Sequence, residues 1–451
     1  MKADNRVTVS YFDKSVLPWI ICTIGMLFYC YNYFLRVSPS VMKDDLMFNL
    51  HITAYQFGNL AAFYYYAYTP MQIPVGMIYD RFGARIVLFF ACLAAVLGVG
   101  LFISADTLAL ASAGRFLIGL GTAFAYIGVL KIASLWLEPK RFAMIAGLTT
   151  AFGMASAIFS DLYLTKFVQL LGYKNALYTS LIVGIILSVF ILIFMRNKPQ
   201  KACSQAGAEK PNMKFRELLH ALKIIFKNPQ MWLIGIIGCL FYMPATVFLD
   251  LWGIPFLRTA YHLDKHTAAM LICTTFVGWI IAGPSIGAFS DYIKRRCLPL
   301  MVSAIMAAIL LSTVFYVRDI PLNYLYVIFF FIGIFCGAHP LCFALGKDNN
   351  ANQISGMAVA FTNTLIMVGG AIFQPVVGLL LDWHTSAVSI AGAPTVFTPG
   401  DYIYALSVVP IGLIIAIGLT FFLKETYCQT REAIEERPTA QIFKLQTRAM
   451  N

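Results

Sequence analysis

Several ionisable side chains lie inside long apolar runs of this sequence. Arg36 lies about eighteen residues into the run 18–42, and Asp250 lies at a matching depth of the run 231–256. A charge near the middle of a membrane helix costs roughly 2.5–3.5 kcal/mol on insertion scales, so such residues commonly mark binding or transport sites. A guanidinium binds a carboxylate through two hydrogen bonds, while a carboxylate receives an ammonium or a proton. The two residues therefore predict a split binding site. The alternatives are a structural ion pair, or an Asp250 at the outer interface.

Other polar groups in the apolar runs extend this candidate site. Tyr29 and Tyr33 share a helix face that leads to Arg36, because residues four apart lie on one side of a helix. The further substrate-binding candidates are Tyr242 and Asn363. Asn363 is equally suited to bond a neighbouring helix.

Three further groups are candidates for proton coupling: Arg115, His339 and Asp161. An imidazole can carry a proton, because its ordinary pKa lies near neutral pH. The alternative for Arg115 is an interhelical packing bond, and the alternative for His339 is a hydrogen-bonded packing residue.

The composition fixes the environment in which these residues must sit. The chain has 451 residues, of which 60% are hydrophobic and 12% charged, whereas a soluble chain usually carries about 25% charge. Lipid must therefore be its main solvent. Only helices and closed barrels satisfy the backbone in lipid, and runs of 20 or more residues without strict alternation predict helices. We expect an all-α membrane protein of twelve transmembrane helices. The apolar runs are 18–42, 55–77, 86–105, 108–134, 142–163, 174–195, 231–256, 267–289, 298–317, 322–345, 354–381 and 402–423.

The basic residues predict the orientation of these helices. With the N-terminus inside, 24 of the 33 lysines and arginines fall in segments on the cytoplasmic side and 6 on the opposite side. Positive charge accumulates on the cytoplasmic side of membrane proteins, so both termini are predicted to be cytoplasmic in a multi-pass protein of the inner membrane. The net charge of +12 is spread over loops and forms no compact patch, which argues against a nucleic-acid partner.

A polar stretch divides the chain into two parts. We expect a six-helix bundle over 1–198, a cytoplasmic linker over 199–228, and a second six-helix bundle over 229–451. Within the linker, 215–226 is amphipathic and basic, which is typical of a helix lying on the membrane surface. The alternative is a disordered tether.

A ten-residue motif occurs twice, at related places in the two parts. Gly76, Asp80, Arg81, Gly83 and Arg85 follow the second run, with Gly76 suited to close helix contact and Gly83 to a tight turn. The copy follows the eighth run, 211 residues later, and contains Gly287, Asp291 and Arg295. Repeats at half the chain length are typical of transporters.

This motif resembles the loop 2–3 signature of the major facilitator superfamily. The run Arg115-Phe-Leu-Ile-Gly-Leu-Gly121 is similar to the second motif of that family, and 356–382 resembles its helix 11. The resemblance implies two pseudo-symmetric six-helix bundles, alternating access, and a gating role for the repeated motif. It also suggests that Arg115 organises a proton path. Drug antiporters of the family carry a Gly-Pro motif in helix 5, whereas 147–161 has no proline, which argues against drug efflux.

Together these patterns predict a secondary active transporter that imports a small polar solute with protons. A zwitterion such as an amino acid or short peptide is favoured, because Arg36 and Asp250 carry opposite charges. The alternatives are an organic-anion symporter, since such proteins of this superfamily carry an arginine near this depth of helix 1, or efflux of a siderophore or metabolite. We expect no enzymatic activity, no catalytic set, no metal and no cofactor. We expect a monomer whose partners are its substrate, membrane lipids and protons.

Overall fold

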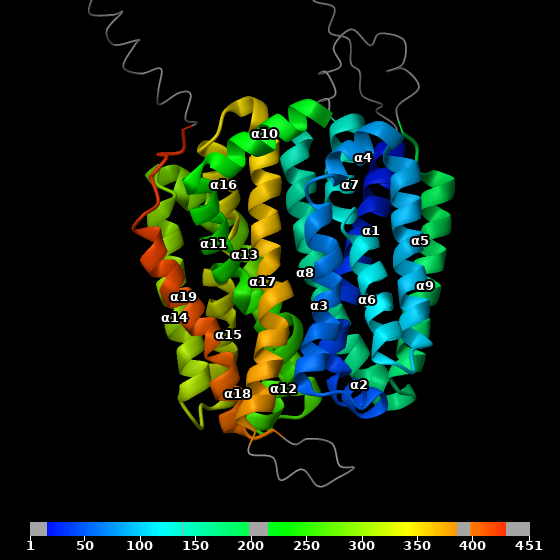
Figure 1. Cartoon of the computed structure of the whole chain (residues 1–451), viewed down its shortest axis with the longest axis vertical. Coiled ribbons are helices and arrows are strands. Elements are labelled where there is room, and N and C mark those ends of the chain that lie inside the picture. The colour runs from blue at the N-terminus through cyan, green and yellow to red at the C-terminus, as the bar shows by residue number, and fades with distance from the viewer. Residues whose placement is uncertain (1–15, 138, 198–214, 386–396, 430–451) are drawn as a thin grey trace, which may run out of the picture.

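A computed structural model describes residues 16–137, 139–197, 215–385 and 397–429. Within these ranges the secondary structure is helical and contains no strand. Eleven helical stretches are long and apolar enough to cross a membrane. The run predicted over 55–77 is not among the eleven. Its main helix, α3 (Ala54–Met71), contains tyrosines and amide side chains, yet it lies alongside its neighbours in the bundle (Figure 1).

The first part of the chain forms nine helices within the described residues. They are α1 (Leu17–Val41), α2 (Lys43–Leu50), α3 (Ala54–Met71), α4 (Val75–Phe82), α5 (Ala84–Ile103), α6 (Leu108–Thr122), α7 (Ala125–Trp136), α8 (Pro139–Leu171) and α9 (Tyr173–Phe194).

The second part follows α10 (Phe215–Lys227), which lies in the predicted linker. Its elements are α11 (Pro229–Met243), η2 (Pro244–Trp252), α12 (Gly253–Ala260), α13 (Lys265–Ile293), α14 (Cys297–Tyr316), α15 (Leu322–Cys336), α16 (Pro340–Asp348), η3 (Asn352–Ile354), α17 (Ser355–His384), α18 (Pro399–Leu406) and α19 (Val408–Thr420).

Several predicted spans are interrupted. The runs 55–77, 108–134, 322–345 and 402–423 each overlap two helices, and 231–256 covers most of α11, the π-helix η2 and half of α12. Proline accounts for two of the breaks, because it lacks the N–H that continues a helix: Pro244 opens η2 and Pro340 opens α16. Apolar runs alone cannot predict such breaks, since the hydropathy stays high across them.

The helices pack in two sets that follow the chain order. In the first set α5 packs against α6 and α9, and α1 packs against α7 and α8. In the second set α13 packs against α15, α11 against α17, and α14 against α19. The sets meet where α3 packs against α17, α8 against α13, and α1 against η2. Figure 1 shows the first set, which runs from blue through cyan to the green of α9, on one side and the second set, which runs from green to red, on the other.

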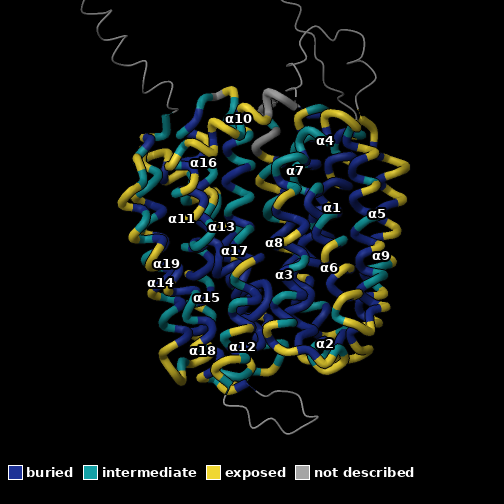
Figure 2. Tube along the Cα trace, in the orientation of Figure 1, coloured by how far each residue is buried: buried dark blue, intermediate teal, exposed yellow. Residues whose placement is uncertain are grey.

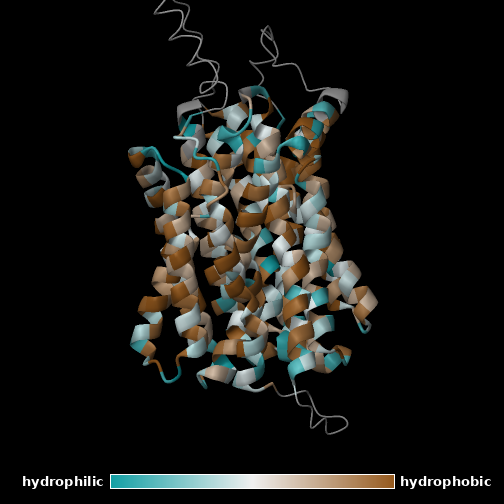
Figure 3. Ribbon diagram, turned by 60° about the vertical axis from the view of Figure 1, so that its left-hand side comes forward, coloured by the Kyte–Doolittle hydropathy of each residue, from teal (hydrophilic) through white to brown (hydrophobic). Residues whose placement is uncertain are grey.

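The two ends of the bundle differ. We call the end bearing α4, α10 and α16 the linker face, and the end bearing α2, α12 and α18 the outer face (Figure 1). The charge distribution predicts that the linker face is cytoplasmic. Hydrophilic residues gather in the loops at both ends, and hydrophobic residues dominate along the helices between them (Figure 3). The buried residues follow the middle of the bundle, and exposed positions lie on its flanks (Figure 2), as expected where lipid covers the flanks.

Backbones approach closely where α3 meets α17. A Cβ on Gly58 would clash with the carbonyl of Gln374 and would lie 2.9 Å from the Cα of Pro375, and a Cβ on Gly378 would clash with the carbonyl of Ala54. Small residues permit such contacts between membrane helices. The two halves are therefore in direct backbone contact toward the outer face.

Candidate functional site

A buried ion pair joins the two halves. Arg36 on α1 contacts Asp250 on η2, with 2.6 Å between Nη2 and Oδ2 and 2.8 Å between Nε and the same oxygen. The two residues are 6% and 2% exposed. The structure thus brings together the two charged residues that the sequence singled out, 214 positions apart.

The local structure of η2 positions Asp250. This segment is a π-helix of nine residues that begins at Pro244, and π-helical turns occur frequently at functional sites. Gln374 on α17 supports the widened turn, because its Nε2 donates to the carbonyl of Thr246 over 2.6 Å. The indole N–H of Trp252 donates back to the carbonyl of Gln374 over 3.2 Å. A hydrogen-bonded seam with α17 therefore holds the carboxylate in place.

A proline in α1 leaves a backbone carbonyl beside Arg36 without its usual helical partner. Pro39 lies inside this helix and lacks the N–H that would bond the carbonyl of Leu35, four residues earlier. Arg115 on α6 donates to this carbonyl from Nη1 over 2.8 Å and to the carbonyl of Arg36 from Nη2 over 3.5 Å. The Ser38 hydroxyl also donates to the Leu35 carbonyl. Arg115 thus bonds the α1 backbone at Arg36 itself and at the residue before it.

Tyrosines surround the Arg36–Asp250 pair. Arg36 Nη2 donates to the hydroxyl of Tyr242 over 3.4 Å, and the Tyr65 hydroxyl donates to Asp250 Oδ2 over 2.9 Å. The guanidinium lies 5.1 Å from the ring centre of Tyr33, 5.5 Å from that of Tyr65 and 5.8 Å from that of Tyr242. Such ring contacts favour a cation.

Tyr29 lies about two helical turns before Arg36 on α1, and its ring packs against Tyr33 and Tyr126. The sequence predicted Tyr33 and Tyr242 at the site. It did not single out Tyr65 from the other tyrosines of α3, because the rotation of α3 about its axis decides which of them faces η2.

His339 and Asn363 occupy two different places around this centre. The ring of His339, between α15 and α16, packs against Tyr242 and Trp279, and its buried Nδ1 has no hydrogen-bond partner among the described residues. Asn363 on α17 donates to Gln72 Oε1 over 2.9 Å, so it bonds the other half of the chain. This bond lies closer to the linker face than the ion pair.

Asp161 on α8 is fully buried, and neither carboxylate oxygen has a hydrogen-bond partner within the described part of the chain.

The repeated motif stays within each half in this structure. Asp80 pairs with Lys131, and Arg85 donates to the carbonyl of Leu192 from Nη2 over 2.7 Å. Arg81 lies over the ring of its neighbour Phe82. Gly83 has φ +77°, which confirms the predicted tight turn. A Cβ on Gly76 would meet nothing within 4 Å, so the close helix contact expected at Gly76 is not made here.

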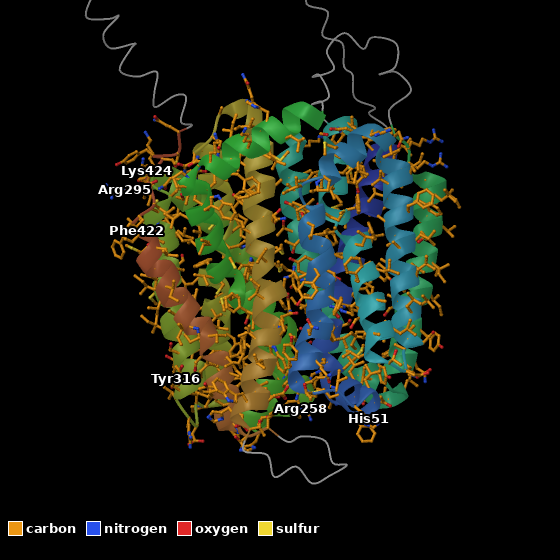
Figure 4. The ribbon with its side chains drawn as sticks, in the orientation of Figure 1. His51, Arg258, Arg295, Tyr316, Phe422 and Lys424 are labelled. Carbon is orange, nitrogen blue, oxygen red and sulfur yellow. The ribbon has the colours of Figure 1, made fainter. Side chains whose placement is uncertain are left out.

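In the second copy of the motif, Arg296 forms the ion pairs, and not the predicted Arg295. Arg295 is exposed (Figure 4), whereas Arg296 pairs with Asp291 at 2.7 Å and with Asp348 at 3.4 Å. The backbone N–H of Arg296 also donates to Glu425 over 2.8 Å. Arg296 lies nine residues after Gly287, just as Arg85 lies nine residues after Gly76, so the motif spacing itself points to Arg296 and the prediction of Arg295 was one residue off. A Cβ on Gly287, as on Gly76, would meet nothing within 4 Å.

Polar contacts also join the halves at the outer face. Asp382 on α17 accepts from the backbone N–H groups of Ala54 and Tyr55, over 3.0 and 2.7 Å, at the start of α3. This placement of a carboxylate at a helix N-terminus is electrostatically favourable. Lys43, which is 7% exposed, donates to the Tyr402 hydroxyl over 2.9 Å. None of these contacts was predicted from the sequence, since each partner lies more than 300 residues away.

An exposed ion pair completes the outer contacts. Asp44 on α2 pairs with Arg258 on α12 at 2.6 Å, and Figure 4 labels Arg258 at this face. Burial raises the pKa of the Asp44 carboxyl, but Lys43 and Arg258 outweigh this effect and lower it below its ordinary value.

The described ion pairs between the halves lie at mid-depth (Arg36–Asp250) and at the outer face (Asp44–Arg258), while the Asn363–Gln72 hydrogen bond joins the halves nearer the linker face. The ion pairs described above at the linker face, Asp80–Lys131, Arg296–Asp291 and Arg296–Asp348, each lie within one half.

Comparison with known proteins agrees with this arrangement. The "Uncharacterized transporter YybO" of Bacillus subtilis is 23% identical over 90% of this chain and 93% of its own length. The "Probable sulfoacetate transporter SauU" of Cupriavidus necator is 21% identical over 80% of this chain and 87% of its own length. The "Hexuronate transporter" of Bacillus subtilis is 23% identical over 63% and 67%, respectively.

A solved structure shares the fold. A bacterial homologue of the human lysosomal transporter Spinster, in an inward-facing and unoccupied conformation, superposes with a TM-score of 0.69 at 13% identity, covering 92% of this chain and 97% of that one. The sequence profile of the Major Facilitator Superfamily matches residues 22–374. The chain is therefore a membrane transporter that belongs to the Major Facilitator Superfamily.

Proposed function

We propose that this transporter carries a small organic anion together with a proton, and that the Arg36 guanidinium binds the carboxylate or sulfonate of the substrate. The observation that carries the proposal is the buried Arg36–Asp250 pair between the halves. In this pair Asp250 occupies the position that a substrate anion would take. Substrate binding then requires Asp250 to give up the guanidinium.

Charge balance in a buried site explains why a proton is needed. The ion pair is neutral as it stands, and an incoming anion would leave one uncompensated negative charge in a poorly solvated place. Such a charge costs several kcal/mol. A proton on Asp250 restores neutrality and frees Arg36 for the substrate in the same step. Anion and proton therefore bind together.

Relatives that are named for their substrates favour an anionic substrate over the zwitterion expected from the sequence. Two relatives are named for sulfoacetate and hexuronate, and both of these compounds are organic acids. Their identity to this chain is 21% and 23%, so they support the class of substrate and not one compound.

A zwitterion remains the second candidate, and one observation favours it. Arg36 and Asp250 present opposite charges from opposite halves, which matches the carboxylate and ammonium of an amino acid. A zwitterion would insert between the two groups without changing the net charge, so its binding would need no proton. The two candidates therefore make opposite predictions for Asp250→Asn.

Uptake into proteoliposomes separates the candidates. We would measure radiolabelled glucuronate, sulfoacetate, alanine and dialanine, with and without an inward proton gradient. For wild type we expect accumulation of an acid only with the gradient. Arg36→Ala should reduce affinity by about 10- to 100-fold, the range for losing a charge-assisted hydrogen bond. Asp250→Asn should bind the anion at least as tightly as wild type and exchange it, but should not accumulate it with the gradient.

Two controls complete the design. Arg36→Lys keeps the charge but not the two-pronged geometry, so it should recover part of the affinity. Arg318→Gln removes a positive charge in an exposed loop and should leave uptake unchanged. Weaker substrate binding in Asp250→Asn would reject the anion and favour the zwitterion, and unchanged uptake in Arg36→Ala would reject the site itself.

A further inference from the structure

A second buried carboxyl lies where the two halves meet on the outer side of the ion pair. Asp161 is ten residues, or about 15 Å, from the outer end of α8. It is 0% exposed, and neither of its oxygens accepts a hydrogen bond from any described residue. Buried charges in proteins are normally paired or hydrogen-bonded. A carboxyl that lacks both is more stable with its proton on.

The groups that face Asp161 from the neighbouring helices are either neutral or, like its own carboxylate, negatively charged. From η2 the neighbouring charged group is Asp250, which Arg36 neutralises in the buried ion pair. From α13 the neighbouring group is the thiol of Cys273. From α1 the Ser40 hydroxyl lies near, but it donates to the carbonyl of Val37. Among the described residues, α7 and α9 contribute no charged group to it.

The position of Asp161 ties its hydration to the outer contact. Here α8 packs against α13, and the Cys273 thiol on α13 donates to the carbonyl of Ile158 on α8 over 3.7 Å. Asp161 lies one helical turn beyond Ile158. If the outer ends of α8 and α13 separate, as alternating access requires, water reaches this seam. A hydrated carboxyl loses its proton far more readily than a buried one.

We propose that Asp161 is a second proton-binding group, which holds a proton while the outer face is closed and releases it when the outer face opens. It is distinct from the proton that accompanies the substrate on Asp250, and it acts as a pH-sensitive latch of the outer face. The direction follows from linkage, since a proton bound only in the closed state favours closure at low pH and opening at high pH. The latch bears on the proposed transport cycle but does not depend on the identity of the substrate.

Cys273 provides a built-in reporter of opening. It is 6% exposed in the closed seam, so a bulky, membrane-impermeant maleimide should reach it only when α8 and α13 separate. We would add the reagent to the outer face of right-side-out vesicles without substrate, between pH 5.5 and 8, and follow modification of Cys273 by peptide mass spectrometry. The ratio of the rates in wild type and Asp161→Asn at each pH removes the intrinsic pH dependence of thiol chemistry.

We expect this ratio to rise with pH by up to about tenfold per unit, the limit for one linked proton. Asp161→Asn mimics the protonated form and should stay closed throughout. The direct effect of an ionised Asp161 on the thiol has the opposite sign, because a neighbouring negative charge disfavours the thiolate. A constant ratio, or a variant that opens more than wild type, would overturn the proposal.

Two further variants serve as controls for this assay. If Asp161→Asn does not fold, Asp161→Thr supplies a second neutral side chain. The wild type is also a test by itself: a rate of Cys273 modification that does not change with pH, after correction for thiol ionisation, rejects the latch. Asp44→Asn is the matched control at the outer face. The pKa of Asp44 is lowered below the ordinary value of an aspartate. Its ion pair with Arg258 is therefore present throughout the assay and is lost only when the pH falls through this lowered pKa. This variant should therefore keep the slope between pH 5.5 and 8.

The assay contains no substrate, so its outcome is separate from the test of the proposed function. Loss of the pH slope in Asp161→Asn with normal substrate binding would support the latch alone. A normal slope in Arg36→Ala with lost binding would show that the latch works without the substrate site.

Discussion

At the scale of single residues, the two buried arginines have different partners. Arg36 has a carboxylate partner and is therefore available for exchange with a substrate anion. Arg115 is 2% exposed and donates instead to two carbonyls of α1, and its Nε has no partner among the described residues. Backbone carbonyls do not leave with a substrate or take up protons. We therefore infer that Arg115 positions α1, rather than relaying protons as its motif suggests.

This role predicts a coupling between Arg115 and Pro39. Arg115→Gln should lower the thermal midpoint of the purified protein and weaken substrate binding, because the Leu35 carbonyl loses its charged donor, an interaction worth about 1.5–3 kcal/mol. Pro39→Ala supplies a backbone N–H to the same carbonyl. The double variant should thus lose less than the sum of the single losses, by on the order of 1 kcal/mol in a double-mutant cycle. Strict additivity would count against the positioning role.

The charged residues of the site were predictable because of the half-length repeat. Arg36 and Asp250 lie at matching depths of the first apolar run of each half, and both had to avoid lipid. Their direct contact was predicted only as an alternative to a binding site, and the structure shows that contact is compatible with both readings. Tyr65 and Asp382 could not be chosen from the sequence, because helix rotation and partners in the other half decide their contacts.

At the scale of helices, the contact of α3 with α17 sets how closely the outer ends approach. Gly58 and Gly378 lie against backbone atoms of the opposite helix. A side chain there must push the backbones apart, because no flexible side chain can yield to it. Opening the outer face, by contrast, removes the clash.

Gly58→Val should therefore hold the outer face open. We expect faster modification of Cys273 by the impermeant maleimide at every pH, and loss of net uptake, because the carrier cannot return to the closed arrangement. Gly147→Val is the matched control, since a Cβ on Gly147 meets nothing within 4 Å; it should behave as wild type in both assays. Normal uptake in Gly58→Val would mean that the α3–α17 contact is not required for closure.

The helices themselves were largely predictable from apolar runs, but their interruptions were not. The π-helix η2 lies inside a run of high hydropathy, and its widened turn is stabilised by Gln374, more than 120 residues away. The linker was predicted over 199–228. Its amphipathic part is confirmed as α10, which lies across the linker face in Figure 1, and 199–214 fall outside the described residues.

At the scale of the whole molecule, the two carboxyls make different contributions to the charge that crosses the membrane. Asp250 gives its proton up with the substrate, so one proton accompanies one anion. Asp161 returns its proton to the outer side when that face opens, so this proton does not cross. Transport of a monovalent anion should then be electrically neutral.

A potassium diffusion potential tests this balance in proteoliposomes. With valinomycin, an inside-negative potential should leave the accumulation of a monovalent acid unchanged, whereas a proton gradient should drive it. If the Asp161 proton also crossed, each cycle would carry one net positive charge inward. Because 100 mV is worth about 2.3 kcal/mol per charge, accumulation would then rise up to roughly 50-fold. Asp161→Asn would abolish that rise. If the membrane potential raises accumulation in wild type but not in Asp161→Asn, Asp161 is a coupling group. If the potential has no effect in either protein, Asp161 is a latch.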